Sequence, residues 1–301
     1  MTEVRVEVPS RIDFAGGWTD VPDFSEAEGG AVLNAAVDRR VSGSASWDED
    51  GFNLGLRLNV GPDSHLGTSS ATNLAFVELI DGLTGRERSA VERAELAWRL
   101  EQWLGEKGGK QDQYAAALGG INLLHFGAAD APAEVEQIEL EPEQQAALEA
   151  RLLLCFSGKS ADSGAQHEGV WERFRNGDRA IRDGLHAIRK TVKPARDALV
   201  AADWTALGEL MSRNRELASA LGGGAVSARM DALFTAAGTA GALGGKPCGA
   251  GGGGYLLFLV PPERRDDVVT ALNKAGGRSA DIRIAARRTR AGESENSGGT
   301  R

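Results

Sequence analysis

Four short segments of the chain combine glycines with polar side chains in patterns suited to binding phosphates and hydroxyl compounds. They are Arg11–Asp20 (RIDFAGGWTD), Pro62–Ala71 (PDSHLGTSSA), Gly109–Tyr114 (GKQDQY) and Gly249–Gly254 (GAGGGG). Together they supply flexible turns, hydroxyl groups and a positioned carboxylate. Each pattern is weak by itself, but their order and spacing favour a phosphotransferase.

The serine-rich turn is the predicted phosphate-binding element. Gly67 permits a tight bend, and Thr68, Ser69 and Ser70 supply hydroxyls. We expect a helix to begin at about Ser70, so that its free N–H groups and positive dipole end attract anions. A serine there could also bind Mg²⁺. The alternative is that Ser69 or Ser70 is simply the helix N-cap. The turn lacks the Gly-Lys-Ser/Thr ending of a Walker loop.

Asp112 and Arg11 are the candidate catalytic residues. Asp112 stands at a predicted helix start, where it could accept a proton from a substrate hydroxyl, with Lys110 keeping it ionised. Arg11 ends a predicted strand and could stabilise charge on a transferred phosphoryl group. The alternatives are a helix N-cap for Asp112 and a surface salt bridge for Arg11.

The predicted substrate-binding residues come from the two glycine-rich turns. Asp20 can hydrogen-bond sugar hydroxyls and Trp18 can offer an aromatic face to a ring, while Gly17 precedes both. Gly251 and Gly252 belong to a run of glycines that leads directly into an apolar strand. Such a run is entropically costly, which favours a loop packed near a ligand over a flexible linker.

Composition restricts the class of protein. The chain has 301 residues, of which 42% are hydrophobic, enough for two domains with real cores. No apolar run is long enough to cross a bilayer, and the first residues do not resemble a signal peptide, so we expect no membrane association and a cytoplasmic location. The net charge of −9 argues against a nucleic-acid partner.

The apolar patterns predict alternating strands and helices. Residues 4–8 should form a strand, 31–41 a core helix or strand, and 69–83 a helix. Ser89 and Glu92 form a capping box at the start of a second helix, with Leu104 among its inward residues. The acidic stretch 128–150 is a predicted domain junction. The remaining predicted strands are 121–126, 151–156, 255–260 and 281–285, and the predicted helices are 113–118, 168–220 with breaks, 226–237 and 263–275.

The segments 11–41, 108–120 and 244–254 resemble the GHMP kinases, the superfamily of galactokinase, homoserine kinase and mevalonate kinase. They are most similar to the D-glycero-D-manno-heptose 7-phosphate kinase and L-fucokinase branch, and the similarity extends over most of the chain. The resemblance implies an α+β fold with a ribosomal-protein-S5-like N-terminal domain (1–148) and a ferredoxin-like C-terminal domain (149–286). Residues 287–301 should form a disordered tail.

The resemblance also implies roles for particular residues, with ATP and Mg²⁺ as cofactors. Asp112 matches the catalytic aspartate and Arg11 the basic residue of the first motif. Residues 67–70 match the phosphate loop, with Ser69 as the Mg²⁺ contact. Asp20 matches a sugar-binding aspartate, and residues 249–254 match the third motif, which shapes the site.

Three positions depart from the family pattern. His65 replaces a usual glycine. Only a short segment separates Val41 from Pro62, where relatives carry further strands and a helix that help to hold adenine. The loop 157–169 differs from that of the heptose kinases.

The function predicted from these features is an ATP-dependent sugar kinase. It would transfer the γ-phosphoryl group to a hydroxyl, with the anomeric one favoured, of a sugar or sugar phosphate similar to heptose 7-phosphate. Two alternatives stay open: a GHMP kinase for a non-sugar alcohol, and a kinase-like sensor that binds sugar or nucleotide without turnover. A homodimer is compatible with the resemblance.

Overall fold

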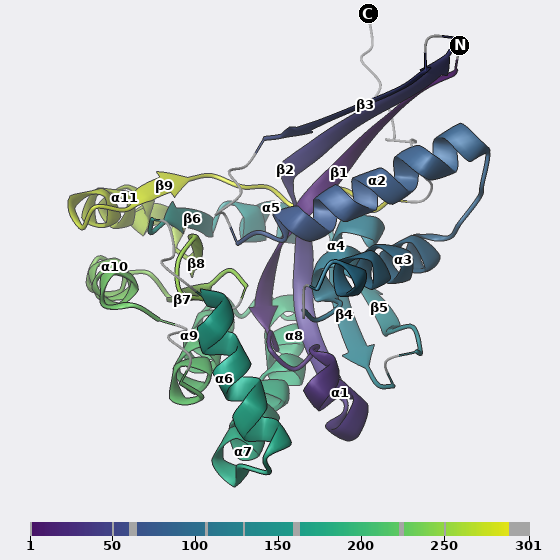
Figure 1. Ribbon diagram of the computed structural model, residues 1–301. Coiled ribbons are helices and arrows are strands. Elements are labelled where there is room, and N and C mark those ends of the chain that lie inside the picture. The colour runs from purple at the N-terminus through teal and green to yellow at the C-terminus, as the bar shows by residue number, and fades with distance from the viewer. Residues whose placement is uncertain are drawn as a thin grey trace, which may run out of the picture.

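The computed structural model describes residues 2–49, 51–59, 65–105, 108–128, 130–158, 163–222, 226–249 and 251–288. Two β-sheets with helices packed against them make up the molecule (Figure 1). The predicted α+β class is confirmed. None of the helices described is long and apolar enough to span a membrane.

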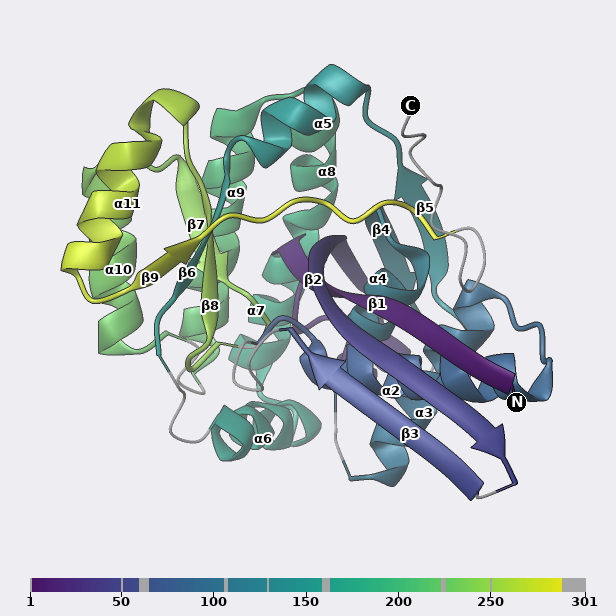
Figure 2. The same ribbon diagram turned by 90° about the horizontal axis from the view of Figure 1, so that it is seen from above.

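The first sheet is built around one long strand. β2 (Gly30–Asp48) pairs along its length with β1 (Thr2–Ala15). On its other edge, β2 pairs first with β4 (Ile121–Phe126) and further along with β3 (Gly51–Leu58); β5 (Glu134–Ile138) lies beyond β4. The short segment after Val41 therefore contains a β-hairpin, which projects from the body of the molecule (Figures 1 and 2).

Three helices cover one face of this sheet. α2 (Thr68–Thr84), α3 (Ala90–Trp103) and α4 (Gln111–Leu118) pack on it and on one another. The predicted capping box at Ser89 is confirmed, because its side chain accepts from Glu92 N–H and the Glu92 carboxylate accepts from Ser89 N–H. The inward position predicted for Leu104 is wrong: the helix ends one residue earlier and Leu104 is exposed.

The second sheet is antiparallel, with strand order β7-β8-β6-β9. Its strands are β6 (Leu152–Phe156), β7 (Gly244–Pro247), β8 (Tyr255–Leu259) and β9 (Arg278–Ala280). Helices α10 (Ala228–Thr239) and α11 (Arg265–Lys274) pack beside it, with the short 3₁₀ turn η2 (Pro262–Arg264) before α11. The strand predicted at 281–285 is wrong, because these residues cross back to the first sheet, where Ala285 N–H donates to the carbonyl of Ala36.

A second group of helices packs beside the sheets. It consists of α6 (Ser163–Arg175), α7 (Arg179–Lys190), α8 (Val192–Val200) and α9 (Trp204–Ala220), with the short α1 (Pro22–Glu28) beside α6. α9 contacts strands of both sheets. Asp178 and Asp203 cap α7 and α9 at the predicted breaks. The expected loop 157–169 is helical from Ser163 onward, whereas residues 159–162 lie outside the described part.

The segment between the halves of the chain is ordered structure. Residues 128–150, expected to be a simple junction, contain β5 and the helix α5 (Pro142–Glu149). One apolar core joins both halves, since Leu33 of β2 belongs to the same buried cluster as Leu152 and Leu257. The division at residue 148 stays a prediction.

The start of the predicted tail is also ordered. Arg288 donates to both carboxylate oxygens of Glu78 on α2, so residues 287 and 288 pack on the N-terminal half. The rest of the predicted tail, from residue 289 to the end, lies outside the described residues.

Candidate active site

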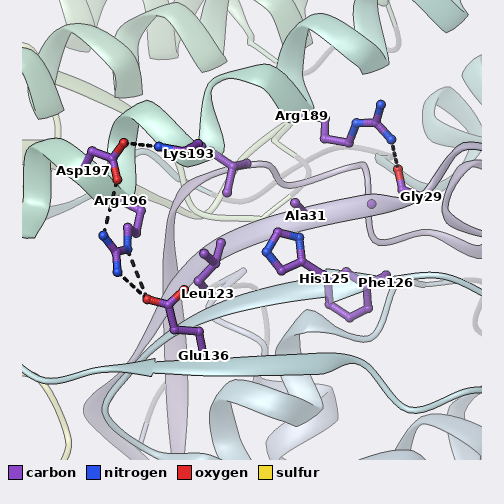
Figure 3. A pocket seen from close by; sticks show the side chains of 12 residues that line it. Gly29, Ala31, Leu123, His125, Phe126, Glu136, Arg189, Lys193, Arg196 and Asp197 are labelled. Atoms are coloured by element: carbon purple, nitrogen blue, oxygen red, sulfur yellow. Dashed lines mark hydrogen bonds and ion pairs between the residues drawn. The ribbon is translucent and has the colours of Figure 1, made fainter.

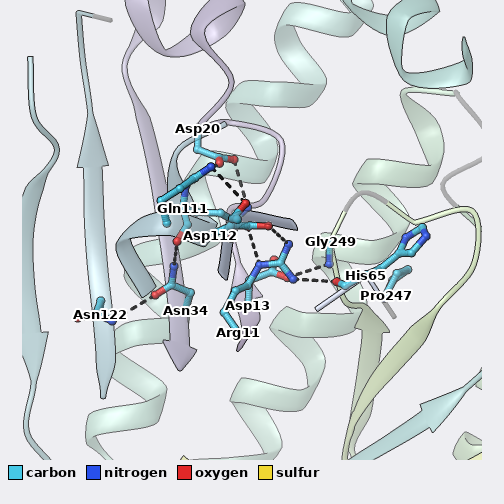
Figure 4. A network of polar contacts seen from close by, with 12 residues as sticks. Arg11, Asp13, Asp20, Asn34, His65, Gln111, Asp112, Asn122, Pro247 and Gly249 are labelled. Carbon is cyan, nitrogen blue, oxygen red and sulfur yellow. Dashed lines mark hydrogen bonds and ion pairs between the residues drawn. The ribbon is translucent and has the colours of Figure 1, made fainter. Parts of the chain in front are cut away.

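A buried ion pair between Arg11 and Asp112 lies at the centre of a polar network (Figure 4). Arg11 Nε donates to Asp112 Oδ1 at 2.7 Å and Nη2 donates to Oδ2 at 2.8 Å, the two-pronged geometry of a strong charged pair. Arg11 Nη1 also donates to the carbonyl of His65, at 2.9 Å. Burial lowers the pKa of Arg11, but Asp112 and Asp13 raise it by more. The arginine therefore stays charged and ties α4 to the turn before α2.

The contacts of Asp112 exclude its role as a helix cap. Lys110 is the N-cap residue of α4, and no side chain caps that end. The prediction that Lys110 keeps Asp112 ionised is wrong, because Lys110 Nζ pairs with the Glu95 carboxylate at 3.0 Å. Arg11 is the cation beside Asp112. Its side chain is 6% exposed and that of Asp112 is 20% exposed, so the pair is not a surface salt bridge but retains one accessible carboxylate.

A second buried ion pair, not predicted, joins the two sheets. Lys246 on β7 donates to Asp13 on β1 at 2.5 Å, and both side chains are almost fully buried. Asp13 lies two residues after Arg11, so the two side chains share one face of β1. This period-two spacing was the available signal for Asp13. Nothing in the local sequence linked it to a lysine 233 positions away.

Asp20 occupies a buried position next to the Arg11–Asp112 pair. Its carboxylate accepts hydrogen bonds from the backbone N–H and from Nε2 of Gln111, both at 3.2 Å. Burial and the nearby negative charge of Asp112 raise the pKa of Asp20 to about 7. The side-chain Oε1 of Gln111 is buried and makes no hydrogen bond within the described residues. A buried acceptor of this kind is costly unless a ligand satisfies it.

The turn that carries Asp20 is firmly held. The Thr19 hydroxyl donates to the carbonyls of Gly16 and Ala31. Trp18 adopts a left-handed backbone conformation, with φ +85°, which is unusual for a bulky residue. Its ring packs edge-on against His167 of α6, with ring centroids 4.8 Å apart. Trp18 is thus mostly buried and presents only a small part of its surface to a substrate.

The structure begins the phosphate-loop helix earlier than expected. α2 starts at Thr68, and its N-cap is Gly67, in a left-handed conformation and without a side-chain cap. The alternative in which Ser69 or Ser70 is the N-cap is therefore wrong. A Cβ on Gly67 would lie 3.0 Å from Asp112 Oδ2, so the loop backbone passes directly beside the candidate base. The helix N-terminus and Asp112 face the same space.

A set of oxygen atoms lies behind this loop. Glu101 of α3 accepts from the Ser70 hydroxyl at 2.8 Å and from Gln113 Nε2 at 2.5 Å. All three residues are buried, and Gln113 Oε1 has no hydrogen-bond partner in the described part of the chain. Ser69, by contrast, is exposed. Carboxylate, hydroxyl and amide oxygens fit the ligand preference of Mg²⁺, which usually takes few protein ligands together with phosphate oxygens.

The described glycines of the run lie between two paired strands and not in a linker, so the linker alternative is wrong. The run connects the paired strands β7 and β8, and Gly249, Gly251 and Gly252 have φ values of +73°, +95° and +79°. A Cβ on Gly249 would lie 3.1 Å from the His65 carbonyl and 3.3 Å from Arg11 Nη2. Glycine is favoured here because the C-terminal half closes directly onto Arg11.

A separate cavity of about 590 Å³ contains none of the predicted site residues (Figure 3). It lies between the strands β4 and β5 and the helix α8. Three of its basic side chains already have partners: Lys193 pairs with Asp197, Arg196 pairs with Glu136, and Arg189 donates to the carbonyl of Gly29. The polar network combines an arginine–carboxylate pair, a helix N-terminus and buried acceptors that lack a hydrogen-bond partner in the described residues. We therefore assign the chemistry to the network.

The structure brings most of the predicted residues together. Gly17 joins the cluster, since a Cβ on it would lie 2.8 Å from Asp13 Oδ2. A hollow between the two halves is lined by Gly17 and Trp18 on one side and by Lys246 and Gly249 on the other. The sequence analysis did not identify five further residues of the network, because their contacts form only in the folded chain: Asp13, Glu101, Gln111, Gln113 and Lys246.

Comparisons with known proteins agree with this arrangement. Residues 31–120 match the profile described as the GHMP kinases N-terminal domain, and residues 195–278 match the GHMP kinases C-terminal one. A D-glycero-α-D-manno-heptose 7-phosphate kinase of Campylobacter jejuni is 25% identical over 94% of this chain and 96% of its own. A mevalonate kinase of Methanothermobacter thermautotrophicus is 30% identical over 75% of this chain and 70% of its own.

The same relationship is visible in three dimensions. The crystal structure of a D-glycero-D-manno-heptose 1-phosphate kinase from Bacteroides thetaiotaomicron superimposes with a TM-score of 0.76 and 21% identity, over 94% of this chain and 96% of the other. With both domain profiles matched and similarity along nearly the whole length of a relative, the chain belongs to the GHMP kinase family.

Proposed function

We propose that the protein is an ATP-dependent sugar kinase that phosphorylates a hydroxyl, preferentially the anomeric one, of a sugar or sugar phosphate similar to heptose 7-phosphate. The observation that carries the proposal is the Arg11–Asp112 pair, which lies between the helix N-terminus at Gly67 and the buried carboxylate of Asp20. The similarity to a heptose 7-phosphate kinase, which extends along nearly the whole length of that protein, supports the substrate class.

Asp112 would act as the general base. Its accessible carboxylate takes the proton of the acceptor hydroxyl, the hydroxyl oxygen bonds to the γ-phosphorus, and the bond to the β–γ bridging oxygen breaks to release ADP. Arg11 holds the carboxylate in place and stabilises negative charge on the transferred group. The backbone of residues 67–70 and the dipole of α2 would bind the phosphates.

Glu101, Ser70 and the side-chain oxygen Oε1 of Gln113 would hold Mg²⁺. The exposed Ser69 would face the phosphates. The metal, when bound, neutralises charge on the phosphate oxygens. Ser69 remains the Mg²⁺ contact expected from the family resemblance. The buried position of Ser70 beside a carboxylate adds a second candidate.

The acceptor sugar would bind against the turn that carries Gly17, Trp18 and Asp20, with Gly251 and Gly252 on the opposite side. A sugar hydroxyl that donates to Gln111 Oε1 would satisfy this buried acceptor. A second hydroxyl would bond to Asp20. The Gln111 side chain thus orients Asp20 through its N–H group and contacts the substrate through its oxygen.

Apolar residues beside the first half of α2 would hold adenine. A Cβ on Gly43 would touch Leu79 of α2 and Leu56 of β3, so these strands and this helix border one another. Phe76 lies one turn nearer the phosphate loop, and Leu58 lies two residues further along β3 on the same face. The β2–β3 hairpin would thereby take the place of the strands and helix that help relatives to hold adenine in this part of the chain.

A substrate panel tests the function. The purified protein, ATP and Mg²⁺ are incubated with sugars, sugar phosphates, mevalonate and homoserine, and products are identified by a mass increase of one phosphoryl group. A phosphorylated sugar, absent with Asp112→Asn, supports the proposal. Phosphorylated mevalonate or homoserine would favour the non-sugar alternative, which the mevalonate kinase relatives keep open. Sugar or nucleotide binding by calorimetry without any product would favour a sensor.

A further inference from the structure

The β2–β3 hairpin presents a row of large apolar side chains to solvent. Trp47 is 66% exposed and Phe52 is 44% exposed, and their rings lie against each other with centroids 6.1 Å apart. Leu54, Leu56 and Leu58 of β3 are also exposed. Period-two spacing places the four β3 residues on the face that α2 covers further along the sheet. The helix packs on β1 and β2, so β3 extends beyond its cover.

A nucleotide at the phosphate loop cannot cover this whole row. Leu58 is at the end of β3 closest to that loop, and Phe52 lies six residues away, roughly 20 Å along an extended strand. An exposed apolar surface of this extent on one element marks an interaction site more often than a free surface.

The outer edge of β3 lacks the features that normally protect an edge strand. In the described residues β3 pairs only with β2, and that pairing runs through eight residue pairs without a bulge. The strand contains neither proline nor lysine, and Arg57 is its one charged residue. Natural proteins usually block such edges, because unpaired N–H and C=O groups readily pair with another strand.

One hydrogen bond shows which backbone groups of β3 face outward. Asn59 N–H donates to the carbonyl of Arg40 on β2, so the N–H and C=O groups of the odd-numbered residues in this segment point toward β2. In an antiparallel ladder these directions alternate, so the N–H and C=O groups of Phe52, Leu54, Leu56 and Leu58 point to the free edge.

We propose that the protein forms a two-fold symmetric dimer in which β3 pairs with the β3 strand of a second copy. The register that uses all four outward residues places Leu54 opposite the partner's Leu56 and Phe52 opposite the partner's Leu58. Gly55 then lies on the two-fold axis, at a closely spaced pair where the absence of a side chain allows the strands to approach.

The charges of the strand fit this register. Asn53 faces the partner's Arg57, so the two arginines of the dimer do not oppose each other. The apolar rows of both copies form one continuous face over a joined sheet. Self-complementarity of this kind is what a symmetric interface requires, since the same patch must match itself.

Sedimentation velocity of the full chain over a range of concentrations tests the proposal. The parent protein should sediment as a dimer. Leu54→Pro removes an outward N–H from each copy without touching the ladder to β2, so the dimer dissociation constant should rise roughly thirtyfold or more, from two lost hydrogen bonds. Leu54→Val keeps the N–H and an apolar side chain, and it should leave the dimer intact.

A charge pair tests the register itself and does not depend on proline being tolerated in the strand. Asn53→Glu, facing the partner's Arg57 twice in the dimer, should tighten association up to about tenfold, and Asn53→Arg should weaken it by a similar factor. Sugar-kinase turnover should not change in the two Asn53 variants, because Asn53 lies on the face of β3 opposite to Leu56 and Leu58.

A parent protein that remains a monomer at about 100 μM would overturn the proposal. So would a dimer that responds to neither Leu54→Pro nor the two Asn53 variants, since its interface would then lie elsewhere. A chain that dimerises only after removal of residues 289–301 would also overturn it for the complete protein, because the tail would then be what occupies the edge.

Discussion

The two ends of the β1–β2 ladder have opposite surroundings. At the inner end, charged side chains are buried: Arg11, Asp13 and Asp20 are each at most 6% exposed, and each has a charged or polar partner. At the outer end, Trp47 and Phe52 are exposed although they are apolar. Burying charge is unfavourable unless it is compensated, and exposing large apolar groups is unfavourable unless something covers them.

The difference between the two ends indicates that buried charges and exposed apolar side chains both need an interaction partner. The inner end gains its order from pairs within the chain and from a substrate that would satisfy Gln111 Oε1. At the outer end the ion pair between Arg5 and Glu3 is exposed, and nothing in the described residues covers Trp47 and Phe52, which points to a second molecule. Substitutions at the inner end should therefore alter catalysis or folding, and those at the outer end should alter association alone.

The largest effect is expected at the inner end, from Asp112→Asn. Loss of a general base lowers kcat about 10²–10⁴-fold. Steady-state kinetics with saturating ATP and sugar would measure it. In this variant the buried charge of Arg11 still has the carboxylate of Asp13 nearby, so the protein should fold. Circular dichroism checks the fold. A kcat within threefold of the parent would remove Asp112 from the mechanism.

Lys246→Met should destabilise the fold. It leaves Asp13 buried without its cation, which typically costs about 3–5 kcal/mol in the free energy of unfolding. Urea unfolding measures the change. The matched control is Lys193→Met, which breaks an ion pair between two exposed side chains and should leave the free energy of unfolding nearly unchanged. Equal effects of the two variants would show that the Asp13–Lys246 pair does not hold the sheets together. Asp13→Leu combined with Lys246→Met should recover part of the loss.

Sugar affinity should depend on pH through Asp20. Its pKa is raised to about 7, so in the folded protein it is protonated below that pH and becomes a hydrogen-bond-accepting carboxylate above it. The KM for the sugar should fall roughly tenfold as pH rises from 6 to 8, as expected when a charged hydrogen bond forms. The KM for ATP serves as an internal reference and should stay constant. Asp20→Asn should flatten the sugar profile; a profile that keeps its slope in this variant would assign the titration to another group.

The same group gives a stability prediction of opposite sign. Because the folded state holds the proton of Asp20 more tightly than the unfolded chain, the free energy of unfolding falls as pH rises from 3.8, the ordinary pKa of an aspartate, to a pKa of about 7, and then stays at the lower value. Asp20→Asn should therefore raise the melting temperature relative to the parent at pH 8 and change it less at pH 4. Calorimetric scans at the two pH values measure the difference, and a destabilised variant at pH 8 would contradict the assignment.

The smallest effect is expected at the outer end, from Trp47→Ser. The side chain is largely exposed and lies far along the hairpin from the phosphate loop, so kcat and both KM values should remain within about twofold of the parent. The same kinetic assay used for Asp112→Asn measures this. A large loss of activity would mean that the hairpin end contributes to the active site and would break the distinction between the two ends.

Much of the fold could be predicted from local pattern. The capping box at Ser89 and the breaks near residues 177 and 203 are signals within a few residues, and the structure reproduces them. The hairpin after Val41 and the elements of 128–150 were missed. β5 and α5 are short and largely polar, so their stability comes from packing and pairing that local periodicity does not reveal.

The sequence by itself determined which chemical groups are available: a glycine turn before a helix, a carboxylate at Asp112, an arginine at position 11 and a run of glycines before an apolar strand. The strand predicted to end at Arg11 continues to Ala15 in the structure. It did not determine their pairing. Arg11 meets Asp112 across 101 residues and Lys246 meets Asp13 across 233, and such contacts depend on how whole sheets pack. Only the tertiary structure decided that Arg11, not Lys110, accompanies Asp112, because burial and distance set electrostatic partners, whereas neighbours in sequence can face different surroundings.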